Sequence, residues 1–204
     1  MIGVSNFLND GTLKATSGGT LQITSPNFVN DGTLSIDGGT LSLRQGVSFF
    51  SLGTPGTFNV GEGTLSGSGT IDCNVVLDPD PSTLAFVLRS DSDFDSLAID
   101  GNMSLAGNLE ISLADGFEPW SGDIFAVLTV GSGDTLSGAF ADVASGGRLD
   151  TMDGSGSFLV DYGPGQYANE IVLSDFESVP EPAALGIAVV SGIGLMARRH
   201  KERR

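Results

Sequence analysis

Apolar and polar side chains alternate in short runs through the first third of the chain. The element Gly-Thr-apolar-x-apolar recurs from Gly11 onward, and its period of two residues is the signature of a strand with one buried face. Threonine takes the opposite face, and glycines and Asn-Asp-Gly sequences mark the turns between strands. The inward pairs predicted by this alternation are Leu13 and Ala15, Leu21 and Ile23, Leu34 and Ile36, and Leu41 and Leu43.

These strands belong to a longer repeat. Residues 6–13, Asn-Phe-Leu-Asn-Asp-Gly-Thr-Leu, return almost unchanged as residues 27–34. A single short strand cannot bury its apolar face alone, whereas stacked coils of about 20 residues can. We therefore expect an all-β fold in which residues 1–77 form a parallel β-helix or solenoid, with a β-sandwich of hairpins as the alternative.

Strand patterns continue after Asp78-Pro-Asp-Pro-Ser82, where two prolines interrupt a hydrogen-bonded ladder. The spacing is less regular there, and the apolar run 124–130 is predicted to be a central strand. We expect residues 78–178 to form a β-rich region that caps the open end of the solenoid, because an uncovered strand edge recruits other chains. The runs that predict strands are 97–99, 103–105, 109–113, 124–130, 158–162 and 170–173.

The segment 179–204 has a different composition. Val179, Pro180, Glu181 and Pro182 precede an uncharged apolar run bounded by Ala183 and Ala197, and a basic tail, 198–204, begins with Arg198 and Arg199. Proline suits a first helical turn, so a helix is predicted over about 183–197. At about 1.5 Å per residue it is shorter than a bilayer core of about 30 Å, which leaves a soluble core helix as the alternative. The terminal position and the basic flank favour one transmembrane helix, N-out and C-in.

The order of Pro180-Glu181-Pro182, a short apolar helix and an arginine cluster resembles the PEP-CTERM sorting signal of Gram-negative bacteria. The same element is also labelled an ice-binding protein C-terminal domain, and the resemblance covers about residues 179–199. It implies an exosortase-type processing enzyme as partner, removal of the tail near Pro182, and export of the body, with exopolysaccharide as a further candidate partner. The Gly-Thr-Leu strands are similar to those of autotransporter-type passenger domains.

Charge divides the body from the tail. Of nine Lys and Arg residues five lie in the tail, and of 25 Asp and Glu residues one does, so residues 1–182 carry four basic and 24 acidic residues. A net charge of −20 excludes nucleic acid as a partner, because its binders need basic patches. The single cysteine, Cys73, excludes an intramolecular disulfide. The start of the chain has neither signal peptide nor capping repeat, so we expect a preceding segment in the natural protein.

Catalytic chemistry has little support in these residues. The only histidine, His200, lies in the tail, so the body has no Ser-His-Asp triad and no His-ligated metal. Alternating Asp91, Asp93 and Asp95 are candidate oxygen ligands for a metal on one strand face, but a solvated acidic loop is favoured, as it is for Asp150 and Asp153. We predict no catalytic residue, no cofactor and no metal.

Two other patterns are candidates for ligand binding. Outward threonines are typical of ice-binding solenoids, but here they stand singly, and the strand preference of threonine explains them better. Trp120 is a candidate for stacking on a sugar, although a core or turn position is favoured. The threonines in question are Thr12, Thr20, Thr33, Thr40 and Thr57.

The sequence as a whole predicts an exported structural or adhesive β-repeat protein of the cell surface or extracellular matrix, without enzymatic activity. Its location would be the cell envelope, the cell surface or the medium, with a single-pass membrane anchor before processing. A carbohydrate- or ice-binding surface module is the alternative. A polysaccharide-degrading β-helix enzyme is less favoured, because Lys14, Arg44, Arg89 and Arg148 are the only bases in the body.

Overall fold

The computed structural model describes residues 2–3, 6–16, 19–24, 27–45, 54–55, 57–79 and 81–179. Over these residues the protein is all-β, with strands in two sheets and no helix. None of the described segments is therefore an apolar helix of membrane-spanning length. The helix predicted over 183–197 and the basic tail 198–204 lie outside the described residues.

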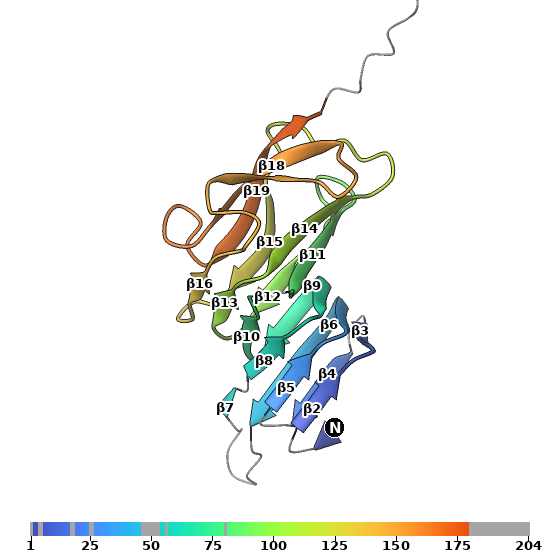
Figure 1. Ribbon diagram of the computed structural model, residues 1–204, viewed down its shortest axis with the longest axis vertical. Coiled ribbons are helices and arrows are strands. Elements are labelled where there is room, and N and C mark those ends of the chain that lie inside the picture. The colour runs from blue at the N-terminus through green and yellow to red at the C-terminus, as the bar shows by residue number, and fades with distance from the viewer. Residues whose placement is uncertain are drawn as a thin grey trace, which may run out of the picture.

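Strands follow one another in coils, each of which begins with a strand of the smaller sheet and continues into the larger one (Figure 1). The larger sheet also contains two short strands, β1 (Ile2–Gly3) and β7 (Thr54–Pro55). The coils in chain order are β2 (Asn6–Asn9), β3 (Thr12–Thr16) and β4 (Thr20–Thr24); β5 (Asn27–Asn30) and β6 (Thr33–Gln45); β8 (Thr57–Val60) and β9 (Thr64–Asp72); β10 (Asn74–Leu77), β11 (Thr83–Leu88) and β12 (Leu97–Ile99); and β13 (Met103–Leu105), β14 (Asn108–Leu113) and β15 (Phe125–Val130).

Neighbouring coils pair in parallel. The smaller sheet has the order β16-β13-β10-β8-β5-β2, where β16 is Leu136–Gly138, and all its pairs are parallel. In the larger sheet β3 and β4 both pair with β6, which pairs with β9. Parallel pairing of strands one coil apart is compatible with the predicted β-helix and does not occur in a sandwich of hairpins.

The parallel ladders continue past residue 78. β11 pairs in parallel with β9, and β13 with β10, so the Asp78-Pro79 turn joins two paired strands. Apart from the short β7, which pairs antiparallel with β6, pairing changes to antiparallel at β15. This strand is central as predicted, because it lies between β12 and β19 (Glu170–Ser178). β18 (Gly156–Tyr162) and β17 (Gly147–Asp150) extend this antiparallel part.

Segment 138–152 covers the outer edge of the last long parallel strand. The Ala141 N–H donates to the Gly107 carbonyl at 2.6 Å, and the Met152 N–H donates to the Ile111 carbonyl at 2.9 Å. Between them the Leu109 N–H donates to the Asp142 carboxylate at 3.1 Å. β14 therefore has hydrogen-bonding partners along both edges.

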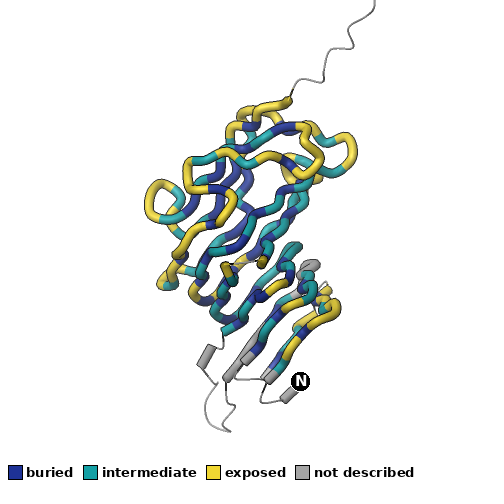
Figure 2. Tube along the Cα trace, viewed as in Figure 1, coloured by how far each residue is buried: buried dark blue, intermediate teal, exposed yellow. Residues whose placement is uncertain are grey.

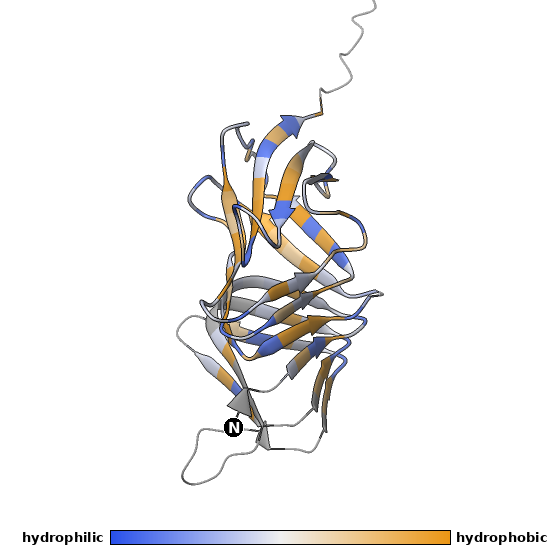
Figure 3. Cartoon of the chain, turned by 90° about the vertical axis from the view of Figure 1, so that its left-hand side faces the viewer, coloured by the Kyte–Doolittle hydropathy of each residue, from blue (hydrophilic) through white to orange (hydrophobic). Residues whose placement is uncertain are grey.

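The core lies between the two sheets and is built from columns of equivalent side chains. Figures 2 and 3 show buried, hydrophobic positions alternating along the strands. Leu34, Leu65, Leu84 and Leu109 are in register from coil to coil and are at most 1% exposed. Each contributes about 1.5–3 kcal/mol through burial. The predicted inward positions are confirmed wherever their side chains are described; those of Ile36 and Leu43 are not.

Two asparagines form an interior polar column that the sequence did not predict. Asn9 and Asn30 are in register and buried, and the Asn9 Nδ2 donates to the Asn30 Oδ1 at 2.6 Å. The Asn30 Nδ2 donates to the Gly32 carbonyl at 2.8 Å. A Cβ at Gly63 would lie 2.8 Å from that same Nδ2, so glycine is required in the next coil. The column satisfies turn carbonyls that burial removes from water.

Candidate functional site

Of the predicted sorting signal, only Val179 lies among the described residues. It follows β19, is 57% exposed, and its N–H donates to the Ser155 carbonyl at 2.8 Å. In Figure 1 the end of β19 lies at the opposite end of the molecule from β2. Pro180, Glu181, Pro182, Ala183, Ala197, Arg198 and Arg199 lie outside the described residues.

The three alternating aspartates do not share a strand face. Asp95 is 5% exposed, and its Oδ1 lies 2.8 Å from the Arg89 Nη1 while its Oδ2 accepts the Val87 N–H at 3.0 Å. The Asp93 carbonyl accepts the Arg89 and Ser90 N–H groups, each at 2.9 Å. The interpretation as a solvated loop therefore fails for Asp95, because its carboxylate is buried against a guanidinium and holds the turn between β11 and β12 together.

Asp153 is also held within a turn. Its Oδ1 accepts hydrogen bonds from the Thr151 hydroxyl at 2.7 Å, the Ser155 hydroxyl at 2.9 Å and the Ser155 N–H at 3.2 Å. The Thr151 hydrogen bond, with smaller contributions from Ser155, lowers the pKa of the Asp153 carboxyl against an opposing effect of desolvation. Asp150 ends β17 and is exposed. Across the described ranges, no group of three or more His, Cys, Asp or Glu residues could hold a metal ion.

Trp120 is displayed on the surface. It is 77% exposed in the loop between β14 and β15, so the favoured core position is wrong and the turn position is confirmed. Its N–H donates to the Asp123 Oδ2 at 2.7 Å, and the Asp123 N–H donates back to its carbonyl at 3.0 Å. Phe117 fills the interior position instead, with its ring edge-on to Phe125. The loop thus holds one aromatic ring in solvent.

Threonines form two outward columns on the larger sheet. Thr12, Thr33, Thr64 and Thr83 are in register, as are Thr20, Thr40 and Thr70. Thr57 lies in the smaller sheet, opposite Asn74. The outward neighbours of the first column differ from coil to coil, so it remains one residue wide. Those neighbours are Lys14, Ser35, Ser66 and Ala85.

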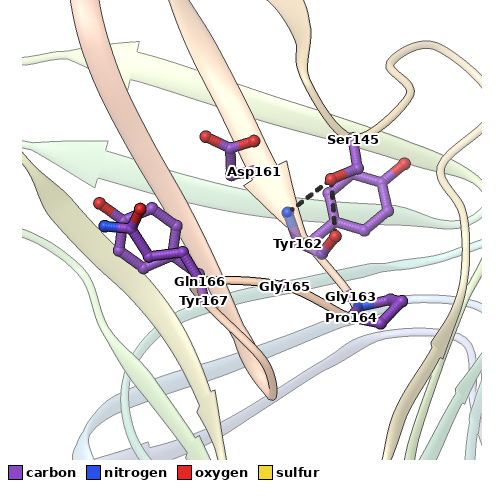
Figure 4. Close-up of a pocket in the computed structure, with 8 residues that line it drawn as sticks. All are labelled: Ser145, Asp161, Tyr162, Gly163, Pro164, Gly165, Gln166 and Tyr167. Atoms are coloured by element: carbon purple, nitrogen blue, oxygen red, sulfur yellow. Dashed lines mark hydrogen bonds between the residues drawn. The ribbon is translucent and has the colours of Figure 1, made fainter.

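An open pocket of about 160 Å³ lies beside the loop 163–167 (Figure 4). The Ser145 hydroxyl bridges the Tyr162 backbone, donating to its carbonyl at 2.6 Å and accepting its N–H at 3.0 Å. Tyr162 donates its own hydroxyl to the Val143 carbonyl at 2.7 Å, and burial raises the pKa of this phenol. Both hydroxyls are thus engaged in the fold. The polar groups left to line the pocket come from Asp161, Gln166 and Tyr167.

The pocket is smaller than the 300–1,000 Å³, roughly, of typical ligand sites. The sequence analysis did not identify it, although the Gly163-Pro-Gly165 loop is a recognisable turn signal. Comparison of the chain with protein-family models, with curated proteins and with solved structures finds no match.

Proposed function

We propose that this protein is a β-solenoid rod with a capped C-terminal end, exported to the cell surface or extracellular matrix, where it has a structural or adhesive role. The tail would act as a PEP-CTERM sorting signal, with a transmembrane helix over about 183–197 as a single-pass anchor, N-out and C-in. An exosortase-type enzyme would then cleave near Pro182. The observation that carries the proposal is the exposed Val179, which directly follows β19 and precedes Pro180 in the sequence.

The use of the acidic residues supports a non-enzymatic role. Asp95 is paired with Arg89, and Asp153 accepts three hydrogen bonds within its own turn. A carboxylate committed to such contacts is a poor general base, because accepting a proton would break those contacts.

A second candidate function is carbohydrate binding, and the exposure of Trp120 favours it. Two hydrogen bonds with Asp123 fix the Trp120 backbone in a turn, and the exposed ring offers an apolar face to a sugar. Exopolysaccharide would then be the partner. Loss of polysaccharide retention on an affinity gel in Trp120→Ala, with retention kept in Trp120→Phe, would support this function, and equal retention of all three proteins would exclude it.

The sorting proposal is tested by the intact mass of the mature chain from cells that express it natively. We expect a C-terminus near Pro182, and accumulation of the unprocessed chain when Pro180 and Pro182 are both replaced by alanine. Ser178→Ala is the matched control, because it changes an exposed side chain just before the signal and leaves residues 179–182 intact. A mature C-terminus at Arg204 contradicts the proposal.

A further inference from the structure

Exposed large hydrophobic side chains gather at the end of the molecule where β19 finishes. Five such side chains are exposed among the described residues, and only Leu8, in β2, lies at the opposite end (Figure 1). The other four belong to the β14–β15 loop, to the β17–β18 turn and to the position directly after β19. They are Trp120, Ile124, Met152 and Val179, each more than half exposed, and we call them the exit face.

Backbone hydrogen bonds hold the segments of the exit face together. The Val179 N–H donates to the Ser155 carbonyl at 2.8 Å, which places the end of β19 beside the β17–β18 turn. In the same turn the Met152 N–H donates to the Ile111 carbonyl of β14 at 2.9 Å, and β14 leads directly into the loop 114–124. The three segments therefore lie at one end of the folded body.

Aromatic rings fill the interior beneath this end. Phe117 of the β14–β15 loop lies edge-on to Phe125 of β15, with ring centroids 6.2 Å apart. Phe125 lies 5.9 Å from Phe158 of β18, which in turn lies 4.9 Å from Phe176 of β19. Because these rings already occupy the interior, the core does not need the exposed side chains of the exit face. Their apolar surface is available to a partner.

The sequence after Val179 indicates which partner is near. This step rests on the proposed function, in which the run 183–197 crosses a bilayer. Val179 and Ala183 are four residues apart, so an extended chain separates them by at most about 14 Å. The headgroup region on one side of a bilayer takes up about 5–8 Å of that distance.

The length of the run brings the body closer still. A helix over 183–197 is about 22 Å long, which is shorter than the hydrocarbon core of about 30 Å. A span that is too short draws its flanking residues toward the bilayer. The end of the body that carries Val179 is then held against the lipid headgroups.

We propose that the exit face docks on the headgroup region of the bilayer that holds the tail. Trp120 is the residue type enriched at this depth, because indole combines an apolar ring with a polar N–H. Ile124 and Met152 add apolar area to the same contact. The tail acts as a short tether with a high effective concentration, so a small contact area is sufficient. The docked body holds residues 180–182 at the membrane surface.

Carboxylates at this end determine which lipids it accepts. The Asp123 Oδ2 accepts the Trp120 N–H at 2.7 Å, and the Glu177 Oε1 lies 3.5 Å from the Arg148 Nη2. Further carboxylates on the same loop and turn are Asp115, Glu118 and Asp153, all exposed. Their charge repels anionic headgroups and leaves zwitterionic lipid as the preferred surface.

Trp120 is the only tryptophan of the chain, so its fluorescence reports on the exit face directly. The full chain is reconstituted into phosphatidylcholine vesicles whose acyl chains carry bromine close to the headgroups, and into the same vesicles without bromine. Bromine quenches only a ring that lies in contact with it. We expect Trp120 to lose most of its emission in the brominated vesicles, and to lose less when phosphatidylglycerol is added.

Two variants serve as controls. Leu8→Trp combined with Trp120→Phe moves the single tryptophan to the opposite end of the molecule, where we expect no quenching. Ile124→Ser combined with Met152→Ser keeps Trp120 and changes only exposed side chains, and we expect weaker quenching because the apolar contact is smaller.

Flotation of the same vesicles separates this proposal from the sorting proposal. A chain that floats with the vesicles while Trp120 remains unquenched overturns docking and leaves the membrane anchor in place, with the ring free for a sugar. A chain that does not float overturns both proposals. Docking is also overturned if the Leu8→Trp probe is quenched as strongly as Trp120, or if the two serine substitutions leave the quenching unchanged.

Discussion

The two ends of this molecule are stabilised in different ways. The coils of residues 6–45 repeat one pattern, pair in parallel and carry little net charge, whereas residues 147–179 have no repeat, pair antiparallel and are acidic. In a repeated coil, side chains pack against the same residue type in the next coil, as Phe7 does on Phe28 and Asn9 on Asn30. Closing a stack therefore requires residues that the repeat does not contain.

The C-terminal part contains such residues. Tyr162 contributes a hydroxyl that donates to the Val143 carbonyl and accepts the Phe140 N–H at 3.3 Å, which ties segment 140–143 to β18. Arg148 contacts the Asp175 carboxylate at 3.0 Å and its carbonyl, where β19 takes a positive φ of 48°. These single contacts replace the columns of the coils.

The largest expected effect is on an interior column. Phe58→Ala should lower the free energy of unfolding by about 3–5 kcal/mol, because Phe58 is fully buried and stacks on Phe28. Phe7→Ala should cost clearly less, since Phe7 lies in the first coil and is only partly buried. Urea denaturation measures both. Equal losses would show that the first coil is covered as well as the third.

In the asparagine column, too, a substitution in the first coil should cost less stability than one in the next coil, and both losses should be smaller than that of Phe58→Ala. Asn30→Ala leaves the half-buried Gly32 carbonyl without its side-chain donor, which costs about 1–3 kcal/mol. Asn9→Ala should cost less, because water reaches the turn of the first coil more easily. Chemical denaturation of the two variants decides the point, and a larger loss for Asn9→Ala would contradict it.

At the closed end, Tyr162→Phe should cost about 1–3 kcal/mol, because the Val143 carbonyl and the Phe140 N–H both lose their buried hydrogen-bond partner. Tyr167→Phe is the control, because this residue lines the open pocket and its hydroxyl has no partner among the described hydrogen bonds. Thermal unfolding followed by circular dichroism would measure both. If the two variants unfold at the same temperature, the hydroxyl does not fasten segment 140–143.

The smallest expected effect concerns pH. In the folded protein the pKa of Asp153 lies below 3.8, the ordinary value for an aspartate. Its stabilising contribution is therefore present above that value and is lost as the pH falls through the folded pKa. Asp153→Asn should therefore lower the free energy of unfolding slightly at neutral pH. The free energy of unfolding of this variant should also fall less steeply with acid than that of the natural sequence. Asp150→Asn serves as the control. If the free energy of unfolding depends on pH identically in both variants, the hydrogen bonds of the turn do not stabilise the ionised Asp153.

Some features followed from local pattern alone. Alternation with a period of two places Leu34 and Leu41 inside and Thr33 and Thr40 outside, because successive side chains of any strand point to opposite faces. The two copies of Asn-Phe-x-Asn-Asp-Gly-Thr-Leu likewise predicted coils that stack in parallel. For these features the sequence was sufficient, because they depend only on neighbours along the chain.

Other features were decided by contacts between distant residues. Asn9 and Asn30 read as turn residues and became a buried column only when one coil lay on the next. Asp95 resembles its exposed neighbours in sequence but is buried against Arg89. Trp120, for which a core or a turn position was expected, is exposed in a turn, while Phe117 packs edge-on to Phe125. The sequence by itself determined which face of each strand is apolar. The tertiary structure decided whether a polar group is buried or an aromatic one exposed, because both depend on which residues, distant in the sequence, lie beside that group in the fold.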